Sequence, residues 1–272
     1  MSADALDGRR KIAEGREAII YEWDDGLVAR VMRSADAGAV VHRSAAASEA
    51  ARLAGVATPR IESVTDIDGL PAQIMERVDG VDLFERLAAN PLRLFAVARI
   101  LIDVHVELHE AAAPAELVTS HEHFGAQIER SPLIPDDVRQ RALTCLAELP
   151  HADIVCHGDY HPGNVLVGDS LPPTLIDWTG ATRGEPAADF ARTRLMLRLG
   201  ELPPGAPLVI RALARVGRAM LRRSYDRGYR QARPVDTALL AKWTLVAASV
   251  RLGEGIESER SALLRLIEGL DV

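Results

Sequence analysis

The first third of the chain alternates short apolar runs with turn residues, a pattern that is typical of β-strands. Four such runs are predicted as strands, at residues 18–21, 27–32, 60–64 and 73–78. The turn signals Asp24-Asp25-Gly26 and Asp68-Gly69 lie between paired runs and predict hairpins. Residues 44–55 instead carry apolar positions at helical spacing and end on a glycine, so we expect one helix there.

From Asp82 onward the apolar spacing is mainly helical. Pro91 opens a long predicted helix whose apolar face includes Leu94, Val97, Leu101, Val104 and Leu108. Further helices are predicted at residues 138–149, 186–199, 206–229 and 235–270, and very short strands at 154–156, 165–167 and 174–176. The pattern predicts an α+β fold with a small β-rich N-lobe, residues 1–78, and a larger, mainly helical C-lobe, residues 79–272.

Composition narrows the class of protein. The 272 residues are 48% hydrophobic and 26% charged, as in an ordinary globular protein, and no apolar stretch approaches the roughly 20 residues that span a bilayer. Two cysteines, Cys145 and Cys156, cannot form a disulfide framework, and the N-terminus lacks an apolar signal region. We therefore expect a cytoplasmic protein without a membrane partner; its oligomeric state stays open.

The net charge of −7 argues against a nucleic-acid partner, because contact with a phosphate backbone needs clustered positive charge. The arginine-dense helix at residues 211–230 is interpreted as a solvated face opposite a core stripe of Leu213, Val216, Met220 and Tyr225. The acidic balance would suit a cationic substrate. Glu254, Glu257 and Glu259 could contribute to binding one, although exposed carboxylates are common on helices.

Two carboxylates and a carboxamide, Asp159, Asn164 and Asp177, lie on loops between the short apolar strands. Phosphoryl transfer requires a positioned acceptor hydroxyl and metal ions that bridge the phosphates, with little covalent chemistry from the protein. Magnesium prefers oxygen ligands, often one or two carboxylates. The three side chains therefore suffice for one group that orients the hydroxyl and two that bind metal.

The order of these residues matches the kinase pattern H-x-D-x-x-x-x-N followed by an aspartate. Here the pattern is His157-Gly158-Asp159-Tyr160-His161-Pro162-Gly163-Asn164, followed by Ile176-Asp177-Trp178. With His-Gly-Asp and Asp-Trp, the chain resembles the aminoglycoside phosphotransferase and choline kinase superfamily more than protein kinases. Ala188-Asp189-Phe190-Ala191, Glu107-Leu108-His109 and residues 74–80 extend the resemblance over roughly residues 10 to 200.

The resemblance implies a protein-kinase-like bilobal fold and a small-molecule kinase that uses ATP and Mg²⁺. Asp159 would be the catalytic base or hydroxyl-orienting group, and His157 would support its loop. Asn164 and Asp177 would hold Mg²⁺, while Asp189 would brace the loops. An aminoglycoside-like acceptor is the first expectation, but macrolides, choline-like alcohols, homoserine and sugars are phosphorylated on the same scaffold.

The nucleotide-binding residues are expected in the N-lobe. Gly15 lies where a turn covers the phosphates, and Arg30 occupies the position of the lysine in kinases, with Glu49 as its candidate ion-pair partner. Arg33 competes with Arg30 for the phosphate contact. At the hinge, the Glu76 carbonyl and the Val78 amide would bind adenine through backbone atoms.

Other interpretations stay open. The arginine at position 30 and the glycine-poor turn are compatible with a non-catalytic nucleotide-binding regulatory module, and residues 15–21 also resemble an atypical, Bud32-like protein kinase. A zinc pair of His105 and His109 is disfavoured, because the metalloprotease pattern requires glutamate directly after the first histidine. His121-Glu122-His123 is interpreted as a solvated loop cluster.

Overall fold

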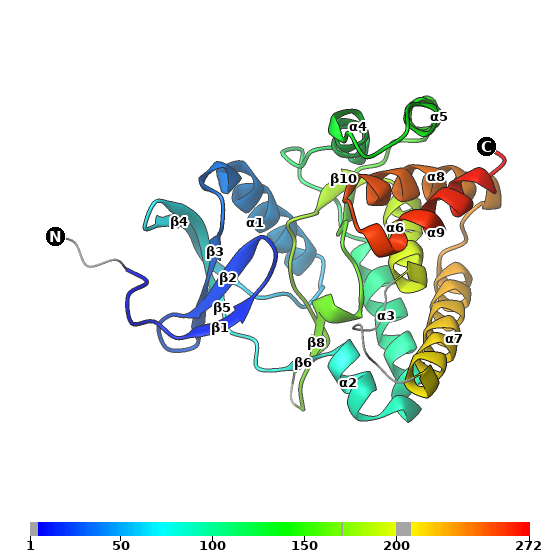
Figure 1. Cartoon of the computed structure of the whole chain (residues 1–272). Coiled ribbons are helices and arrows are strands. Elements are labelled where there is room, and N and C mark those ends of the chain that lie inside the picture. The colour runs from blue at the N-terminus through cyan, green and yellow to red at the C-terminus, as the bar shows by residue number, and fades with distance from the viewer. Residues whose placement is uncertain (1–4, 170, 200–207) are drawn as a thin grey trace.

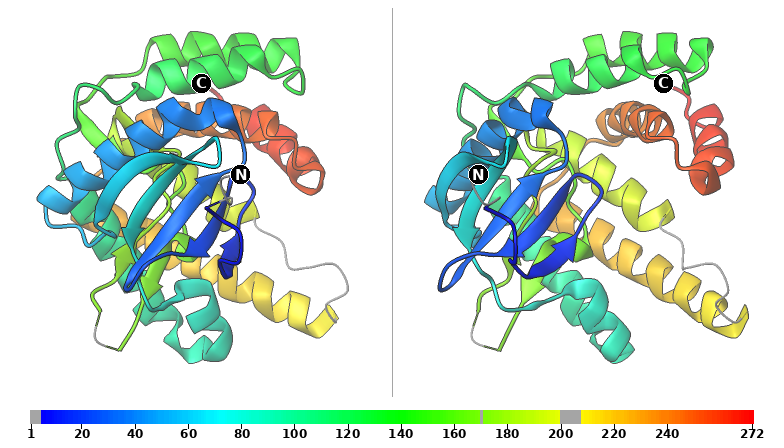
Figure 2. Two further views of the ribbon diagram at one scale, coloured as in Figure 1. Left: turned by 90° about the vertical axis from the view of Figure 1, so that its left-hand side faces the viewer. Right: turned by 60° about the vertical axis from the view of Figure 1, so that its left-hand side comes forward.

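The computed structural model describes residues 5–169, 171–199 and 208–272, with only the backbone for 208–214. A β-sheet lobe with one helix stands beside a helical lobe, and short strands lie between the two (Figure 1). The turned views show the same two parts with the N-terminal sheet facing the viewer (Figure 2). The described part of the chain therefore has the α+β, two-lobed layout that the sequence predicts.

The N-terminal lobe is a five-stranded antiparallel sheet with the strand order β1-β2-β3-β5-β4. Its strands are β1 (Lys11–Glu14), β2 (Ala18–Glu22), β3 (Leu27–Met32), β4 (Ile61–Ile67) and β5 (Leu70–Glu76). A short helical turn, η1 (Ala35–Ala37), leads into α1 (Gly38–Leu53), which begins ahead of the predicted residue 44. Gly55 has a φ of +103°, the left-handed conformation expected for a glycine after a helix.

A buried polar contact anchors α1 to the sheet. Gln73 of β5 is 4% exposed, and its Nε2 donates to the Val41 carbonyl at 3.0 Å and to Ser44 Oγ at 2.8 Å. Because an unpaired buried amide would be costly, these two bonds favour one position of the helix on the sheet.

The C-terminal part continues with β6 (Val81–Asp82), α2 (Leu83–Ala89), η2 (Pro91–Arg93), α3 (Leu94–Leu108), α4 (Ser120–Arg130), α5 (Asp136–Ala147), β7 (Ile154–Cys156), η3 (Pro162–Asn164), β8 (Val165–Val167), β9 (Thr174–Leu175), β10 (Thr182–Gly184), α6 (Pro186–Leu199), α7 (Leu208–Ala232), α8 (Thr237–Gly253) and α9 (Glu257–Glu268). The short strands pair as β6-β8-β9 and β10-β7. The predicted apolar face of α3 is confirmed, since all five of its residues are buried.

The structure differs from the sequence prediction at three points. No helix was predicted between Pro114 and Pro135, but α4 lies there, and its start is fixed by a capping box in which the Thr119 and Glu122 side chains each bond the other's backbone N–H. The predicted helix 235–270 is two helices, because α8 ends before Gly255, which has a φ of +74°. Strands β1, β6 and β10 were not predicted as separate strands.

The core stripe of α7 also differs from the prediction. Leu221, Tyr225 and Tyr229 are buried, whereas Val216 and Met220 are exposed. The predicted start of this helix, residues 206–207, lies outside the described residues, as does the side chain at 213.

Among the described residues, no helix is both long enough and apolar enough to cross a bilayer. The N-terminal sheet ends at Glu76, and the next strand, β6, pairs with β8 of the C-terminal part. We keep the lobe boundary between residues 78 and 79 as a proposal consistent with this change of pairing.

Candidate active site

A cavity of about 580 Å³ is lined by residues from both lobes. The sheet lobe contributes the β1–β2 turn, Arg30 and Met75, while the opposite wall comes from the loops after β7 and β9 and from helices α4, α6 and α8. Asp159, Asn164 and Asp177 all line this cavity. The fold therefore brings together the three side chains that the sequence singled out.

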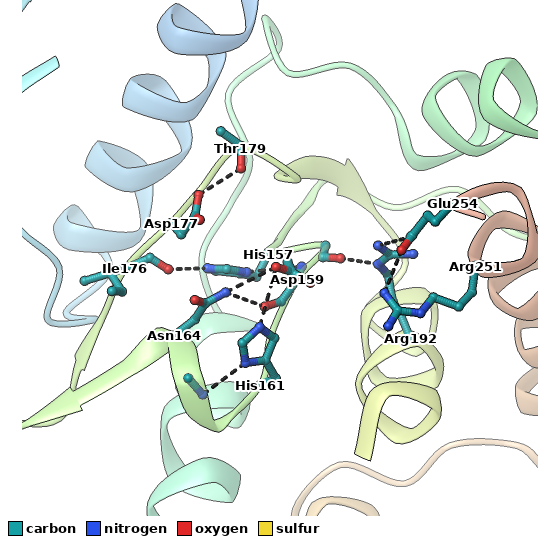
Figure 3. A network of polar contacts seen from close by, with 12 residues as sticks. His157, Asp159, His161, Asn164, Ile176, Asp177, Thr179, Arg192, Arg251 and Glu254 are labelled. Atoms are coloured by element: carbon teal, nitrogen blue, oxygen red, sulfur yellow. Dashed lines mark hydrogen bonds and ion pairs between the residues drawn. The ribbon is translucent and has the colours of Figure 1, made fainter. Parts of the chain in front are cut away.

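His157 connects the two loops that carry these residues. Its ring is fully buried; Nδ1 accepts from the Asp159 backbone N–H at 3.2 Å, and Nε2 lies 3.0 Å from the carbonyl of Ile176 (Figure 3). Burial lowers the pKa of His157, so the ring is neutral, with its proton on Nε2 facing the carbonyl. Through this one ring the position of Asp159 is coupled to the residue that precedes Asp177.

Asp159 presents a carboxylate to the cavity. Asn164 Nδ2 donates to the Asp159 carbonyl at 2.9 Å and lies 3.4 Å from its Oδ2, while His161 Nε2 lies 3.6 Å from Oδ2 (Figure 3). Burial alone would raise the pKa of Asp159, but His161 and Arg192 outweigh it and lower that pKa to about 2. The group is therefore ionised near neutral pH and can accept a hydrogen bond from a hydroxyl.

Asp177 has an unusual backbone conformation. Its φ of 63° lies in the left-handed region, which aspartate tolerates better than most residues. Oδ1 accepts from Arg30 Nη2 at 2.9 Å and from the Thr179 hydroxyl at 2.8 Å. Both bonds reach the same oxygen, so Oδ2 is the oxygen left for another ligand.

The donor set at this point of the cavity fits a magnesium ion. Asn164 uses its Nδ2 for Asp159, which leaves Oδ1 as an acceptor, and Asp177 retains Oδ2. Both available atoms are hard oxygens, and both residues line the cavity. Two protein oxygens beside a space large enough for phosphates and water match the way proteins hold Mg²⁺ with a nucleotide.

A buried cluster beneath the loop holds Asp159 in place from the other side. Asp189 is 1% exposed, and its two oxygens accept from the backbone N–H groups of His157 at 2.6 Å and Gly158 at 2.9 Å. His105 Nε2 lies 3.2 Å from Asp189 and its Nδ1 lies 2.5 Å from the Tyr225 hydroxyl. The bracing role predicted for Asp189 is confirmed.

His105, His109 and Asp189 also lie close enough together to hold a metal ion, since their ligand atoms are within 4.8 Å of one another. Both oxygens of Asp189 are engaged by backbone donors, and both Nδ1 atoms face tyrosine hydroxyls, at 2.5 Å for His105 and 2.6 Å for His109. Hydrogen bonds therefore account for these atoms, whereas His109 Nε2, 3.5 Å from Asp189 Oδ2, has no hydrogen-bond partner among the described residues. That the histidine pair does not bind zinc stays a prediction.

The cluster makes stability sensitive to acid. Burial is the main cause that lowers the pKa of His105 to about 3, whereas an unfolded histidine titrates near 6.5. Below pH 6.5 the unfolded chain binds a proton that the folded chain does not, so stability is lost as the pH falls towards 3. We expect His105→Gln to reduce the stability difference between pH 7 and pH 5 by about 2 kcal/mol, measured by urea unfolding at both pH values.

The exposed His42 of α1 supplies the control for this experiment. His42→Gln should leave the pH dependence as in the wild type. If the difference in the free energy of unfolding between pH 7 and pH 5 is the same in His105→Gln as in the wild type, His105 does not stay neutral in the folded protein.

Only some of the N-lobe residues predicted to bind nucleotide line the cavity. Gly15 and Arg30 line the cavity, whereas Arg33 bonds to the Gly15 carbonyl and to Glu14 and so braces the turn. Glu76 and Val78 are not among the lining residues, although the neighbouring Met75 is. Their backbone contacts to adenine remain a prediction.

The expected ion pair between Arg30 and Glu49 is wrong. Glu49 lies on the exposed side of α1 and pairs with Arg52, while Arg30 pairs with Asp177. The opposite side of α1 carries Ser48, whose hydroxyl lies 2.8 Å from that of Thr58. Thr58 in turn accepts from Trp178 Nε1 at 2.9 Å, so hydrogen bonds rather than an ion pair connect α1 to the Asp177 loop.

The Asp159 and Asp177 loops touch through glycines. Gly158 has a φ of +78°, and a Cβ placed on it would lie 2.0 Å from the Gly180 carbonyl oxygen. We expect Gly158→Ala to separate the loops, lowering kcat at least tenfold and stability by more than the ~1–2 kcal/mol that a left-handed backbone costs. Steady-state kinetics and thermal unfolding measure the two effects.

Gly69→Ala measures the cost of the left-handed backbone alone, because Gly69 has a φ of +80° and open space around its Cβ position. This control should lose stability but keep kcat. Equal kcat in the two variants would contradict the close approach of the loops.

Several cavity residues were not assigned a role from the sequence. His161 accepts from the Gly163 N–H through Nδ1, Thr179 bonds Asp177, and Arg192 bonds the Gly158 carbonyl. The pairing of His161 within the recognised segment could have been inferred, but Arg192 comes from α6 and carries no local signal. His121 and His123 lie in α4 rather than in a loop, and His123 lines the cavity.

The C-terminal glutamates are also corrected. Glu254 and Glu259 are largely buried and paired with arginines, not exposed carboxylates of a helix. Glu257 is exposed, as expected.

The antiparallel sheet with one helix, the helical C-terminal lobe and the cavity between them define a protein-kinase-like fold. The chain belongs to the phosphotransferase enzyme family, whose model matches residues 9–235. It is a small-molecule phosphotransferase that transfers phosphate to a hydroxyl group, and the predicted enzyme class is confirmed. No curated protein matches the sequence.

Solved structures share this fold at low sequence identity. A thermostable mutant of aminoglycoside phosphotransferase APH(4)-Ia, in a ternary complex with ADP and hygromycin B, has a TM-score of 0.65 and 17% identity over 97% of this chain and 93% of that chain. Aminoglycoside phosphotransferase APH(3'')-Id from Streptomyces rimosus, in complex with ADP and streptomycin, has a TM-score of 0.59 and 16% identity over 92% of this chain and 94% of that chain. Macrolide 2'-phosphotransferase MphH from Brachybacterium faecium has a TM-score of 0.53 and 18% identity over 96% of this chain and 91% of that chain.

Proposed function

We propose that the protein transfers the γ-phosphate of ATP to a hydroxyl of a small polar molecule, with Mg²⁺ bound by Asn164 and Asp177. The observation that carries this proposal is the convergence of an ionised Asp159, the free oxygens of Asn164 and Asp177, and Arg30 on one cavity. Similar structures that contain ADP support the nucleotide. A cytoplasmic location belongs to the same proposal.

Each residue has a separate task in this proposal. Asp159 accepts the hydrogen bond of the acceptor hydroxyl and directs its oxygen towards the phosphate, and His157 holds the Asp159 loop against the Asp177 loop. Arg30 offers its guanidinium to phosphate oxygens from β3, and the Gly15 turn covers the phosphates. A bound Mg²⁺ would neutralise charge on the transferred phosphate.

A panel of hydroxyl compounds with ATP and Mg²⁺, read by product mass, tests the function. The panel includes the acceptor class that the resemblance favours, aminoglycosides, together with macrolides, amino sugars, sugars, choline and homoserine. A phosphorylated product that disappears without Mg²⁺ is the expected result. Nucleotide binding without transfer to any acceptor would support the regulatory module instead, and transfer only to a protein would support an atypical protein kinase.

A further inference from the structure

The charges around the cavity bear on what it accepts. Its lining contains four carboxylates (Glu17, Asp159, Asp177 and Glu254) and four guanidinium groups (Arg16, Arg30, Arg192 and Arg251). The formal charges of these eight side chains cancel. The acidic net charge of the whole chain is therefore not concentrated in the cavity.

The wall beyond Asp159 is formed by α4, α6 and the end of α8, and it holds one further carboxylate, Glu254. Arg192 Nη2 donates to Glu254 Oε1 at 2.7 Å, and Arg251 Nη1 donates to Oε2 at 2.6 Å (Figure 3). Both oxygens are thus engaged by guanidinium groups. An ammonium group that used a remaining lone pair of Glu254 would have to lie beside both arginines.

A second carboxylate fixes this arrangement. Arg251 also donates to both oxygens of Glu259, at 2.7 and 2.8 Å, and the Glu259 side chain is only 5% exposed. A forked pair of this kind gives Arg251 a defined orientation. Arg251 therefore cannot easily move away to leave Glu254 free.

Arg192 itself faces the reacting end of the cavity. Its Nε donates to the Gly158 carbonyl, beside Asp159. Its Nη1 is buried, so the group faces the cavity as a positive charge rather than as an open hydrogen-bond donor. Among the described residues that form this wall, the carboxylate of Glu254 is already paired with arginines.

Resting on the proposed function, we propose that the acceptor is an uncharged or anionic hydroxyl compound, such as a sugar, a polyol or a hydroxy acid, and not a polycation. Amino groups on the acceptor would meet Arg192 and Arg251 at short range, where like charges repel. Hydroxyl or carboxylate oxygens of the acceptor would instead be attracted to these guanidinium groups. Aminoglycosides carry several ammonium groups, so this inference departs from the aminoglycoside-like acceptor that the resemblance suggests.

The test measures kcat/KM with ATP and Mg²⁺ on matched acceptors: glucose, N-acetylglucosamine, glucuronate and glucosamine, with hygromycin B, streptomycin, glycerol and homoserine added to widen the panel. We expect activity with uncharged or anionic members and a kcat/KM about tenfold lower for each added ammonium group. A polycation that is phosphorylated best would overturn this inference and leave the proposed function intact. Transfer to no member of the panel would overturn both.

A charge variant gives an independent readout. Glu254→Gln removes the carboxylate between the two arginines and should shift the ratio of kcat/KM for anionic over cationic acceptors about tenfold towards the anion. Glu257→Gln, an exposed carboxylate of α9 outside the cavity lining, is the matched control and should leave the ratio unchanged. If Glu254→Gln impairs folding, the wild-type panel still decides; an unchanged ratio in a folded variant contradicts the role of the Arg192–Glu254–Arg251 contacts.

Discussion

Asp159→Asn is expected to lower kcat by about 10²–10⁴-fold, the range that a positioned base contributes. The amide keeps the shape of the side chain but removes the charge that accepts the hydroxyl proton. Because Asp159 is ionised well below neutral pH, with its pKa lowered to about 2, the loss should persist across pH 5–9. Nucleotide affinity should change little, since the group faces the acceptor in the proposed arrangement.

Kinetics with a phosphorylated acceptor and nucleotide titration by calorimetry measure these quantities. Asp153→Asn is the control. Asp153 lies directly before β7, its side chain is 80% exposed and it pairs with Arg183, so the kcat of this variant should match that of the wild type. A kcat for Asp159→Asn within threefold of the wild type would remove Asp159 from the chemistry.

The second large effect concerns Asp189. Asp189→Asn is expected to lower the free energy of unfolding by about 3–5 kcal/mol, as when one partner of a buried charged network is removed. Its oxygens accept from two backbone N–H groups and from His105, and an amide nitrogen would place a donor against one of these donors. Activity per folded molecule should also fall, because the His157–Gly158 backbone loses an anchor.

Urea unfolding and kinetics on the folded fraction separate the two consequences. Asp103→Asn is the control, because Asp103 pairs with Arg99 on the exposed side of α3 and such pairs contribute at most ~1 kcal/mol. An Asp189→Asn variant as stable as this control would mean that the buried carboxylate does not support the loop.

The sequence predicted those parts of the fold and site that depend on residues close together in the chain. The hairpin at Asp24-Asp25-Gly26, the apolar face of α3 and the spacing from Asp159 to Asn164 are all local, and the structure bears out each of them. Helix α4 could have been predicted too, because Thr119 and Glu122 form the capping pattern within four residues.

The parts of the site that the sequence did not predict depend on contacts between residues far apart in the chain. Whether Glu49 or Ser48 faces Thr58 and the Asp177 loop is decided by how α1 rotates on the sheet, where Gln73 binds Ser44. Arg192 reaches Gly158 only because α6 packs under the loop, and Glu254 becomes a cavity residue because α8 ends there. The pairing of charges on the cavity wall formed by α4, α6 and the end of α8 therefore could not be inferred from composition. The acidic net charge of the chain had instead suggested a cationic substrate.

Transfer of an isotope-labelled phosphate tests the central claim most directly. ATP carrying ¹⁸O in its γ-phosphate is incubated with Mg²⁺, the acceptor selected from the panel, and either wild type or Asp159→Asn. The account predicts that wild type delivers the labelled phosphate to the acceptor hydroxyl and that Asp159→Asn does so more slowly by a factor of about 10² or more. Label that appears only in free phosphate, or in the acceptor at equal rates with both proteins, would contradict it.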